Sequence, residues 1–148
     1  MPHRLGDHLF LVDTNVICER RKGTKANAGV RKFWKEVDSE SVYLSVQTIG
    51  EIRAGIEKIL RRGDVKQSQV LESWLSTIVQ EYADRILVFD DDCAQVWGKL
   101  MASQNQHPID KQIAAIALIH RMAIVTRNVD DFAGTCVKLI NPFDKKDE

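Results

Sequence analysis

The sequence has little cysteine, no excess of charge of either sign and no long apolar run. Its three cysteines lie far apart and form no C-x-x-C pair, which argues against a disulfide framework and against a thiolate zinc site. The four histidines show no spacing typical of metal ligands. No apolar run approaches the ~20 residues of a membrane span, and the polar amino terminus carries no apolar segment of the signal-peptide kind. We therefore expect a cytoplasmic protein with no membrane partner.

The overall charge of the chain gives no indication of nucleic-acid binding. Lys and Arg together number 21, as do Asp and Glu, so the formal net charge is zero and no global basic field is present. Any nucleic acid would have to bind a local basic patch. The length of 148 residues is typical of one domain with one core. We predict a single domain over residues 1–148, with a core of about 8–143 and a charged tail at 144–148.

Short apolar runs alternate with stretches of helical periodicity along the whole chain. This alternation is typical of an α/β fold, and it predicts a central, mostly parallel sheet of about five strands with helices on both faces. The helices at 45–60 and 71–82 are expected to form an antiparallel hairpin, because only a short break at 61–64 separates them. The predicted strands lie at 9–12, 41–44, 86–89, 123–125 and 137–140, and the other helices at 14–19, 30–37, 93–101 and 108–118.

Three acidic residues occupy comparable places in this pattern. Asp13 follows the first strand, Glu51 lies in the second turn of the helix after the second strand, and Asp110 lies in the first turn of the helix before the fourth strand. Each alone is more simply an ordinary surface or helix-terminal acid. Together they can meet at the carboxyl edge of the sheet, where such folds place their chemistry. Because gathered carboxylates repel one another, they imply a shared cation, and all-oxygen ligands favour Mg²⁺ or Mn²⁺ over zinc.

A run of three acids, Asp90 to Asp92, follows the third predicted strand. It could form a metal cluster, but acids at the start of a helix also cap its amides and favour its dipole. We predict that this run caps the helix at 93–101.

At this point the chain resembles the PIN-domain ribonucleases, specifically the VapC-type and FitB-like toxins of bacterial toxin–antitoxin modules. The resemblance covers nearly the whole chain, and its strength lies in five weak motifs that occur in order at spacings similar to those of the family. These motifs lie at Leu11–Val16, Leu44–Gly55, Ile109–Ala115, Val125–Phe132 and Ile140–Phe143.

The resemblance implies a role for each matching residue. Asp13, Glu51 and Asp110 would bind Mg²⁺, or Mn²⁺ in its place, while Asn128 and Thr126 would orient water or substrate. Many relatives have aspartate where this chain has Asn128, which weakens the case for a second tightly held metal; Asp130 or Asp131 could compensate. Lys111 stands where relatives commonly have a small residue, so it could contact phosphate or be solvated. The candidates for contact with the substrate are Arg53, Lys111, Arg20, Arg21 and Lys22.

The implied activity is Mg²⁺-dependent endonucleolytic hydrolysis of RNA by a toxin that a VapB- or FitA-like antitoxin neutralises. DNA would be contacted only through the antitoxin, and the toxin would form a homodimer through the hairpin at 49–82. Two alternatives remain open. A PIN-fold module could bind RNA or protein without cleaving, or the Asp13-Thr14-Asn15 loop could belong to a haloacid-dehalogenase-type phosphatase. Asn15 counts against the phosphatase, since those enzymes carry an acid–base carboxyl there.

Overall fold

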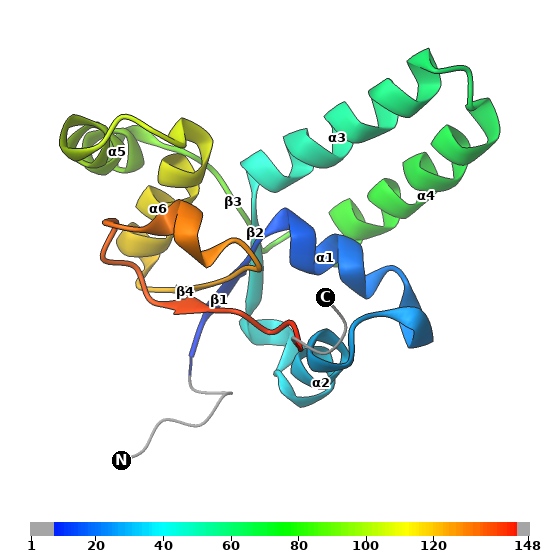
Figure 1. Ribbon diagram of the computed structural model, residues 1–148, viewed down its shortest axis with the longest axis horizontal. Helices are drawn as coiled ribbons and strands as arrows, with labels where there is room; N and C mark the ends of the chain where they lie inside the picture. Colours follow the sequence, from blue (N-terminus) through cyan, green and yellow to red (C-terminus); the bar gives the residue numbers. More distant parts are fainter. Residues whose placement is uncertain (1–7, 145–148) are drawn as a thin grey trace.

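The computed structural model describes residues 8–144. A five-stranded parallel sheet in the order β3-β2-β1-β4-β5 forms its centre (Figure 1). This confirms the predicted α/β fold, and every neighbouring pair of strands is parallel where the sequence predicted a mostly parallel sheet. The strands are β1 (Phe10–Val12), β2 (Val42–Ser45), β3 (Ile86–Leu87), β4 (Ala123–Val125) and β5 (Leu139–Ile140).

β1 and β4 form the middle of the sheet. Their registers pair Phe10 with Ala123 and Val12 with Val125, and all residues of both strands are buried. A strand covered on both faces reads as a continuous apolar run, which is how both strands appear in the sequence. Their carboxyl ends therefore lie side by side at one edge, where Asp13 and Thr126 follow directly.

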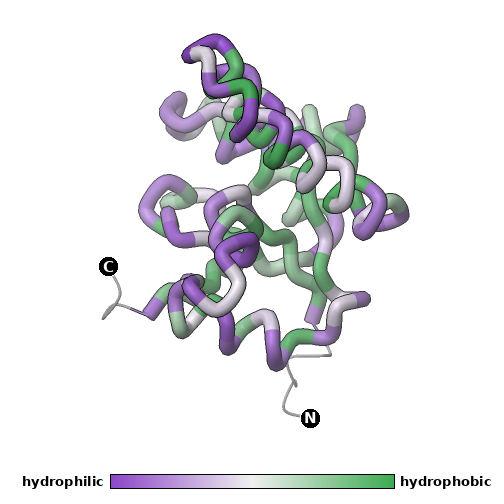
Figure 2. Tube along the Cα trace, turned by 90° about the vertical axis from the view of Figure 1, so that its right-hand side faces the viewer, coloured by the Kyte–Doolittle hydropathy of each residue, from purple (hydrophilic) through white to green (hydrophobic). Residues whose placement is uncertain are grey.

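Helices cover both faces of the sheet and create a core on each side. Phe10 and Val12 pack into one core and Leu11 into the other, as the alternation of side chains along a strand requires. Figure 2 shows apolar residues along the interior of the chain trace and polar residues around it. The first core lies under α1 (Thr14–Arg20), α2 (Ala28–Glu36), α3 (Val46–Arg61) and α4 (Val65–Glu81), and the second under α5 (Asp91–Ser103) and α6 (Pro108–His120).

The predicted hairpin of α3 and α4 is present and extends away from the sheet (Figure 1). The Ser45 hydroxyl accepts a hydrogen bond from the Thr48 amide at the start of α3, and the Asp64 carboxylate accepts one from the Gln67 amide at the start of α4. Between the helices, Gly63 adopts a φ of 90°, a conformation that is accessible to glycine at little cost.

The acid run behaves as a cap, as predicted. The Asp90 carboxylate accepts a hydrogen bond from the Cys93 amide at 3.0 Å, and Asp91 and Asp92 lie in the first turn of α5. This contact holds the pKa of Asp90 below its ordinary value. The bond stabilises the start of α5, and the exposed Asp90 lies on the edge strand's side of the sheet rather than in its centre.

Two strands are each two residues shorter than predicted. β3 ends at Leu87 because the chain turns outward, leaving Val88 59% exposed, and β5 begins only at Leu139 after Cys136 adopts a φ of 64°. Both are edge strands, and an apolar run cannot by itself show where pairing with a single neighbour stops. The 3-10 helices are η2 (Gly23–Lys25), η3 (Ser39–Ser41) and η4 (Val129–Phe132).

The carboxyl end of the described chain packs on α2. The Asn27 carboxamide oxygen accepts a hydrogen bond from the Asp144 amide at 2.8 Å, and Phe143 joins the first core. Gly29 permits this approach, because a Cβ there would collide with the Pro142 carbonyl. Residues 145–148 of the predicted charged tail lie outside the described part. Within residues 8–144, no helix has the length and apolarity needed to cross a membrane.

Candidate metal centre

Asp13 lies at the junction of β1 and α1 and is only 5% exposed. One carboxylate oxygen accepts a hydrogen bond from the Thr14 amide at 2.9 Å, and the other accepts from the Thr126 hydroxyl at 2.8 Å and the Asn15 carboxamide at 3.3 Å. Burial raises the pKa of Asp13, although these hydrogen bonds act to lower it. The hydrogen bonds therefore hold the Asp13 carboxylate in place, while its burial disfavours the ionised form.

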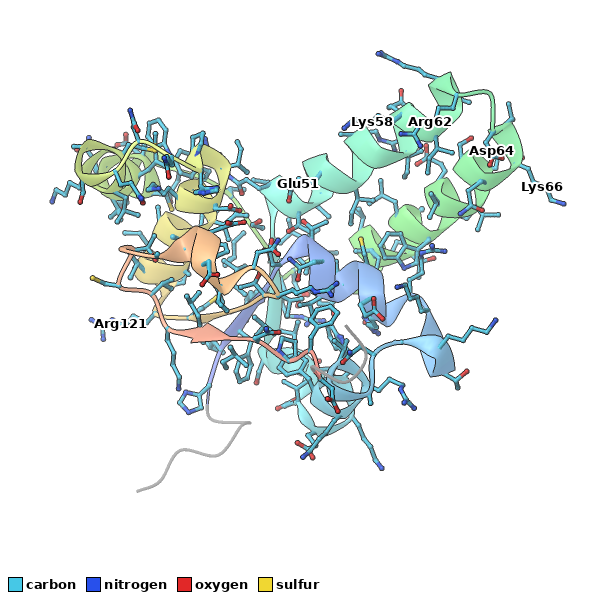
Figure 3. The ribbon with its side chains drawn as sticks, in the orientation of Figure 1. Glu51, Lys58, Arg62, Asp64, Lys66 and Arg121 are labelled. Carbon is cyan, nitrogen blue, oxygen red and sulfur yellow. The ribbon has the colours of Figure 1, made fainter. Side chains whose placement is uncertain are left out.

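Thr14 connects Glu51 with Asp13, because its amide binds Asp13 and its hydroxyl binds Glu51. This hydroxyl donates to the Glu51 carboxylate at 2.6 Å and lies 3.1 Å from the Thr48 hydroxyl. Glu51 lies near the start of α3, whereas Lys58, Arg62 and Lys66 lie toward the far end of the hairpin (Figure 3). The helical position that the sequence suggested therefore brings Glu51 to the edge of the sheet.

Asp110 completes the group of three predicted acids from the first turn of α6. Burial raises its pKa to about 6, and the negative charges of Asp13, Asp131 and Glu51 add to this effect, while His107 opposes it. Such mutual effects arise only when charges lie close together. The structure thus brings Asp13, Glu51 and Asp110 into one negatively charged region.

Thr126 and Asn128 follow β4, but they are placed differently. Thr126 is fully buried; its hydroxyl donates to Asp13 and accepts from the Asn128 amide at 3.0 Å. Asn128 is exposed, and within the described residues its side chain makes no hydrogen bond and caps no helix. Its predicted role in orienting water or substrate stays a prediction.

Asn15 is a member of this region that the sequence analysis did not select. Its carboxamide donates to Asp13 and Thr126, both at 3.3 Å, and its oxygen accepts from the Arg127 amide at 2.9 Å. It therefore joins the ends of β1 and β4. Its place two residues after Asp13, in the first turn of a helix, was the available sequence signal.

His107 and Asp131 also join the region. His107 Nδ1 lies 3.8 Å from Asp110, and His107 Nε2 lies 3.8 Å from Asp131. His107 is exposed, and the sequence analysis gave it no role in the site because it compared only the spacing between histidines. The available signal was the place of His107 three residues before Asp110, on one helical turn.

Three predicted substrate contacts are engaged in ion pairs, one of which joins the Lys22 ammonium to the Glu19 carboxylate at 2.8 Å. The Arg20 guanidinium makes two hydrogen bonds to Glu81, at 3.0 and 3.3 Å, and the Arg53 guanidinium makes two to Glu72, at 2.6 and 2.7 Å. Contact of either arginine with substrate stays a prediction, and it would require the ion pair to open or to be shared.

Arg21 and Lys22 are placed closer to the acids. They line a hollow of about 320 Å³ that extends from Thr14 and Glu51 to Trp74. Trp74 also packs under the Arg21 guanidinium, whose centre lies 5.8 Å from the ring centroid. A basic wall beside an acidic centre is an arrangement suited to a phosphate backbone.

Lys111 corrects the sequence interpretation. It is 2% exposed, so it is not solvated, and its ammonium donates to the Gln106 carbonyl and to the Gln104 carboxamide oxygen. A buried ammonium held by a loop in this way is not free to contact a phosphate. Lys111 instead fixes the segment that precedes α6.

The chemistry of the donors suits a hard divalent cation, although among residues 8–144 it is His107, Asp110 and Asp131 whose ligand atoms lie within 4.8 Å of one another. Asp13, Glu51 and Asp110 supply carboxylate oxygens, and Thr126 and Asn15 hold Asp13 in place behind them. The raised pKa values of Asp13 and Asp110 reflect burial and negative charge that nearby cationic side chains leave uncompensated. A cation such as Mg²⁺ or Mn²⁺ would supply the missing positive charge.

Comparisons with known proteins agree with this geometry. Residues 10–138 match the PIN domain family. Toxin FitB of Neisseria gonorrhoeae is 31% identical over 141 residues, covering 91% of this chain and 99% of FitB. VapC ribonuclease Y4jK of Sinorhizobium fredii is 28% identical over 143 residues, covering 92% of this chain and 99% of the relative. The crystal structure of FitAcB from Neisseria gonorrhoeae superposes with a TM-score of 0.80 at 31% identity, covering 90% of this chain and 98% of that chain.

The family match extends from β1 to the residue before β5 and includes all the acids described above. None of these comparisons supports the phosphatase alternative, which depended on the Asp13-Thr14-Asn15 loop alone. The chain belongs to the PIN-domain family.

Proposed function

We propose that this protein is a metal-dependent endoribonuclease toxin, in which Asp13, Glu51 and Asp110 bind Mg²⁺ or Mn²⁺. The observation that carries the proposal is the meeting of these acids at the carboxyl edge of the sheet, where Thr14 binds Asp13 through its amide at 2.9 Å and Glu51 through its hydroxyl at 2.6 Å. Asp110 lies near enough for the negative charges of Asp13 and Glu51 to raise its pKa. The names of two relatives, a toxin and a ribonuclease, support the same activity. RNA as substrate would place the protein in the cytoplasm.

Each residue has a separate task in the proposed reaction. A bound divalent cation would lower the pKa of a water molecule and neutralise charge that develops on the phosphate. Asp13 would contribute the most rigid ligand, because three hydrogen bonds hold it. Thr126 and Asn15 maintain that position, and Arg21 and Lys22 would attract the RNA backbone along the adjacent hollow.

The direct test is cleavage of total cellular RNA by the purified protein, free of any antitoxin, with Mg²⁺ or Mn²⁺. We expect discrete fragments that disappear with EDTA and that fall by about a thousandfold or more in Asp13→Asn and Asp110→Asn, since a lost metal site removes several kcal/mol of transition-state stabilisation. Asp130→Asn is the matched control, because Asp130 is exposed and lies next to the site without joining it.

Two results would overturn the proposal. Intact RNA after incubation of folded wild-type protein with either metal would favour a module that binds RNA or protein without cleavage, a function with which the neutral, exposed Asn128 is compatible. Full activity in Asp13→Asn would show that the chemistry lies elsewhere.

We also propose two protein partners. One is a VapB- or FitA-like antitoxin, through which alone DNA would be contacted; coexpression of the neighbouring gene should then relieve growth arrest.

The other is a second copy of the chain, bound through α3 and α4, where Val65, Val70 and Val79 are 40–51% exposed. Sedimentation should show a dimer at micromolar concentration, and a monomer there would contradict this assembly.

A further inference from the structure

A mixed cluster of imidazole and carboxylate groups lies beside the three predicted acids. One atom from each of His107, Asp110 and Asp131 can be chosen so that all three atoms lie within 4.8 Å of one another. Two ligands bound to one ion at about 2.1 Å lie roughly 3–4 Å apart, depending on the angle between them. His107 lies 3.8 Å from Asp110 through Nδ1 and 3.8 Å from Asp131 through Nε2, and an ion would be bound through one of these nitrogens only. The ligand atoms would therefore have to draw together slightly from the 4.8 Å limit to bind one ion.

The chain fixes His107 in this place from two directions. The ammonium of Lys111 binds the Gln106 carbonyl, and the indole N–H of Trp97 donates to the Pro108 carbonyl at 3.0 Å. His107 lies between these anchored carbonyls, with a φ of 54°. Burying an ammonium costs several kcal/mol unless polar groups compensate for it. Lys111 therefore needs its contact with the Gln106 carbonyl, and this contact restrains the loop that carries His107.

Within residues 8–144, the Asp131 carboxylate accepts no hydrogen bond, and His107 lies 3.8 Å from it. Asp131 lies in η4, whose start is not capped by any side chain, and its carboxylate faces His107. Its charge acts on both Asp13 and Asp110. Asn128 is neutral, and in this segment it is the charge of Asp131 that acts on the other two acids.

We infer that His107, Asp110 and Asp131 form a second divalent-cation position, and that its imidazole nitrogen makes this position prefer Mn²⁺ to Mg²⁺. The inference rests on the proposed function only in that Asp110 is shared with the position assigned to Asp13 and Glu51. Mg²⁺ is a hard ion that dehydrates reluctantly and strongly prefers oxygen ligands, whereas Mn²⁺ is softer and accepts an imidazole nitrogen beside carboxylate oxygens. The position therefore restores the second metal that the neutral Asn128 would otherwise disfavour.

The rival explanation is an ordinary charge contact, in which protonated His107 offsets the acids and binds no metal. The two explanations differ in a spectroscopic observable. A bound Mn²⁺ ion with an imidazole ligand shows coupling to nitrogen in pulsed electron paramagnetic resonance, and a charge contact shows none.

The experiment is a titration of the purified full chain with Mn²⁺ alone, in the absence of RNA. We expect two bound ions and a nitrogen coupling from one histidine. His107→Ala should abolish this coupling and weaken the second binding event by about tenfold or more, the scale of effects seen when support for a metal site is lost. His120→Ala is the matched control, because His120 is exposed in the last turn of the same helix.

A second pair of variants tests the carboxylate. Asp131→Asn should weaken the second binding event, and Asp130→Asn should leave it unchanged. Circular dichroism would establish that all variants are folded. Absence of nitrogen coupling in the wild type, or its persistence in His107→Ala, would overturn the inference.

The outcomes also separate this inference from the proposed nuclease. If RNA is cleaved in an Asp13-dependent way but Mn²⁺ shows no nitrogen coupling, only the second position fails. If the coupling is present and depends on His107 but RNA stays intact, the second position stands and the nuclease proposal fails.

Discussion

Charged side chains gather in two parts of the molecule, and they are arranged in opposite ways. Along α3 and α4 the charges are exposed, and Arg53 pairs with Glu72 at 2.6 Å. At the carboxyl edge of the sheet, Asp13 and Asp110 are partly or fully buried beside Asp131, and the pKa of Asp110 is raised to about 6. Water screens the charges of the hairpin, whereas the carboxylates at the edge of the sheet are withdrawn from water and raise one another's pKa values, an arrangement that a cation would stabilise.

The largest expected effect comes from removing charge at the edge of the sheet. Glu51→Gln should reduce Mg²⁺-dependent RNA cleavage by about a hundredfold or more, since a carboxylate that binds the cation or its water is worth several kcal/mol. Glu57→Gln is the control, because Glu57 is exposed on the same helix and faces Arg53 at 4.0 Å. Equal activity of the two variants would mean that the position of Glu51 beside Thr14 has no catalytic consequence.

An intermediate effect is expected on stability in the absence of metal. The folded-state pKa of Asp110, about 6, exceeds its ordinary value of 3.8, so the folded protein binds more protons than the unfolded chain between about pH 4 and 6. Stability is therefore lost as the pH rises through this window. In EDTA at pH 8, Asp110→Asn should raise the free energy of unfolding by about 1–3 kcal/mol.

The control for this measurement is the pH itself. At about pH 3 or below, where Asp110 is largely protonated in both states, urea denaturation should show little difference between Asp110→Asn and the wild type. Asp130→Asn should change little at either pH. A destabilised Asp110→Asn at pH 8 would show that the carboxylate is already compensated without metal.

The smallest effect is expected on the hairpin. Glu72→Gln removes one member of an exposed ion pair, and such pairs in water add little to stability. The urea midpoint should therefore stay within experimental error of the wild type, at both low and high salt. A clear loss of stability that salt abolishes would show that the hairpin charges are as consequential as those at the edge of the sheet.

Local sequence features were enough to predict most of the architecture. The apolar runs of β1 and β4 are buried on both faces, and this burial is what makes such runs continuous in sequence. The caps at Asp90 and Ser45 depend on residues three positions away, so their signals are also local. The predicted bounds of β3 and β5 were wrong, because each edge strand pairs with a single neighbour. Where that pairing stops depends on the neighbour, which lies elsewhere in the chain.

The sequence by itself determined the parallel sheet, the hairpin and the arrival of Asp13, Glu51 and Asp110 near one edge, because each follows from the period and order of the elements. Only the tertiary structure decided that Lys111 is buried and that His107 and Asp131 lie beside Asp110. Whether a lysine is solvated or buried, and whether a histidine faces an acid, depends on loops that pack against other elements. The contact of His107 with Asp131 joins two loops with no periodic relation, so no local pattern encodes it.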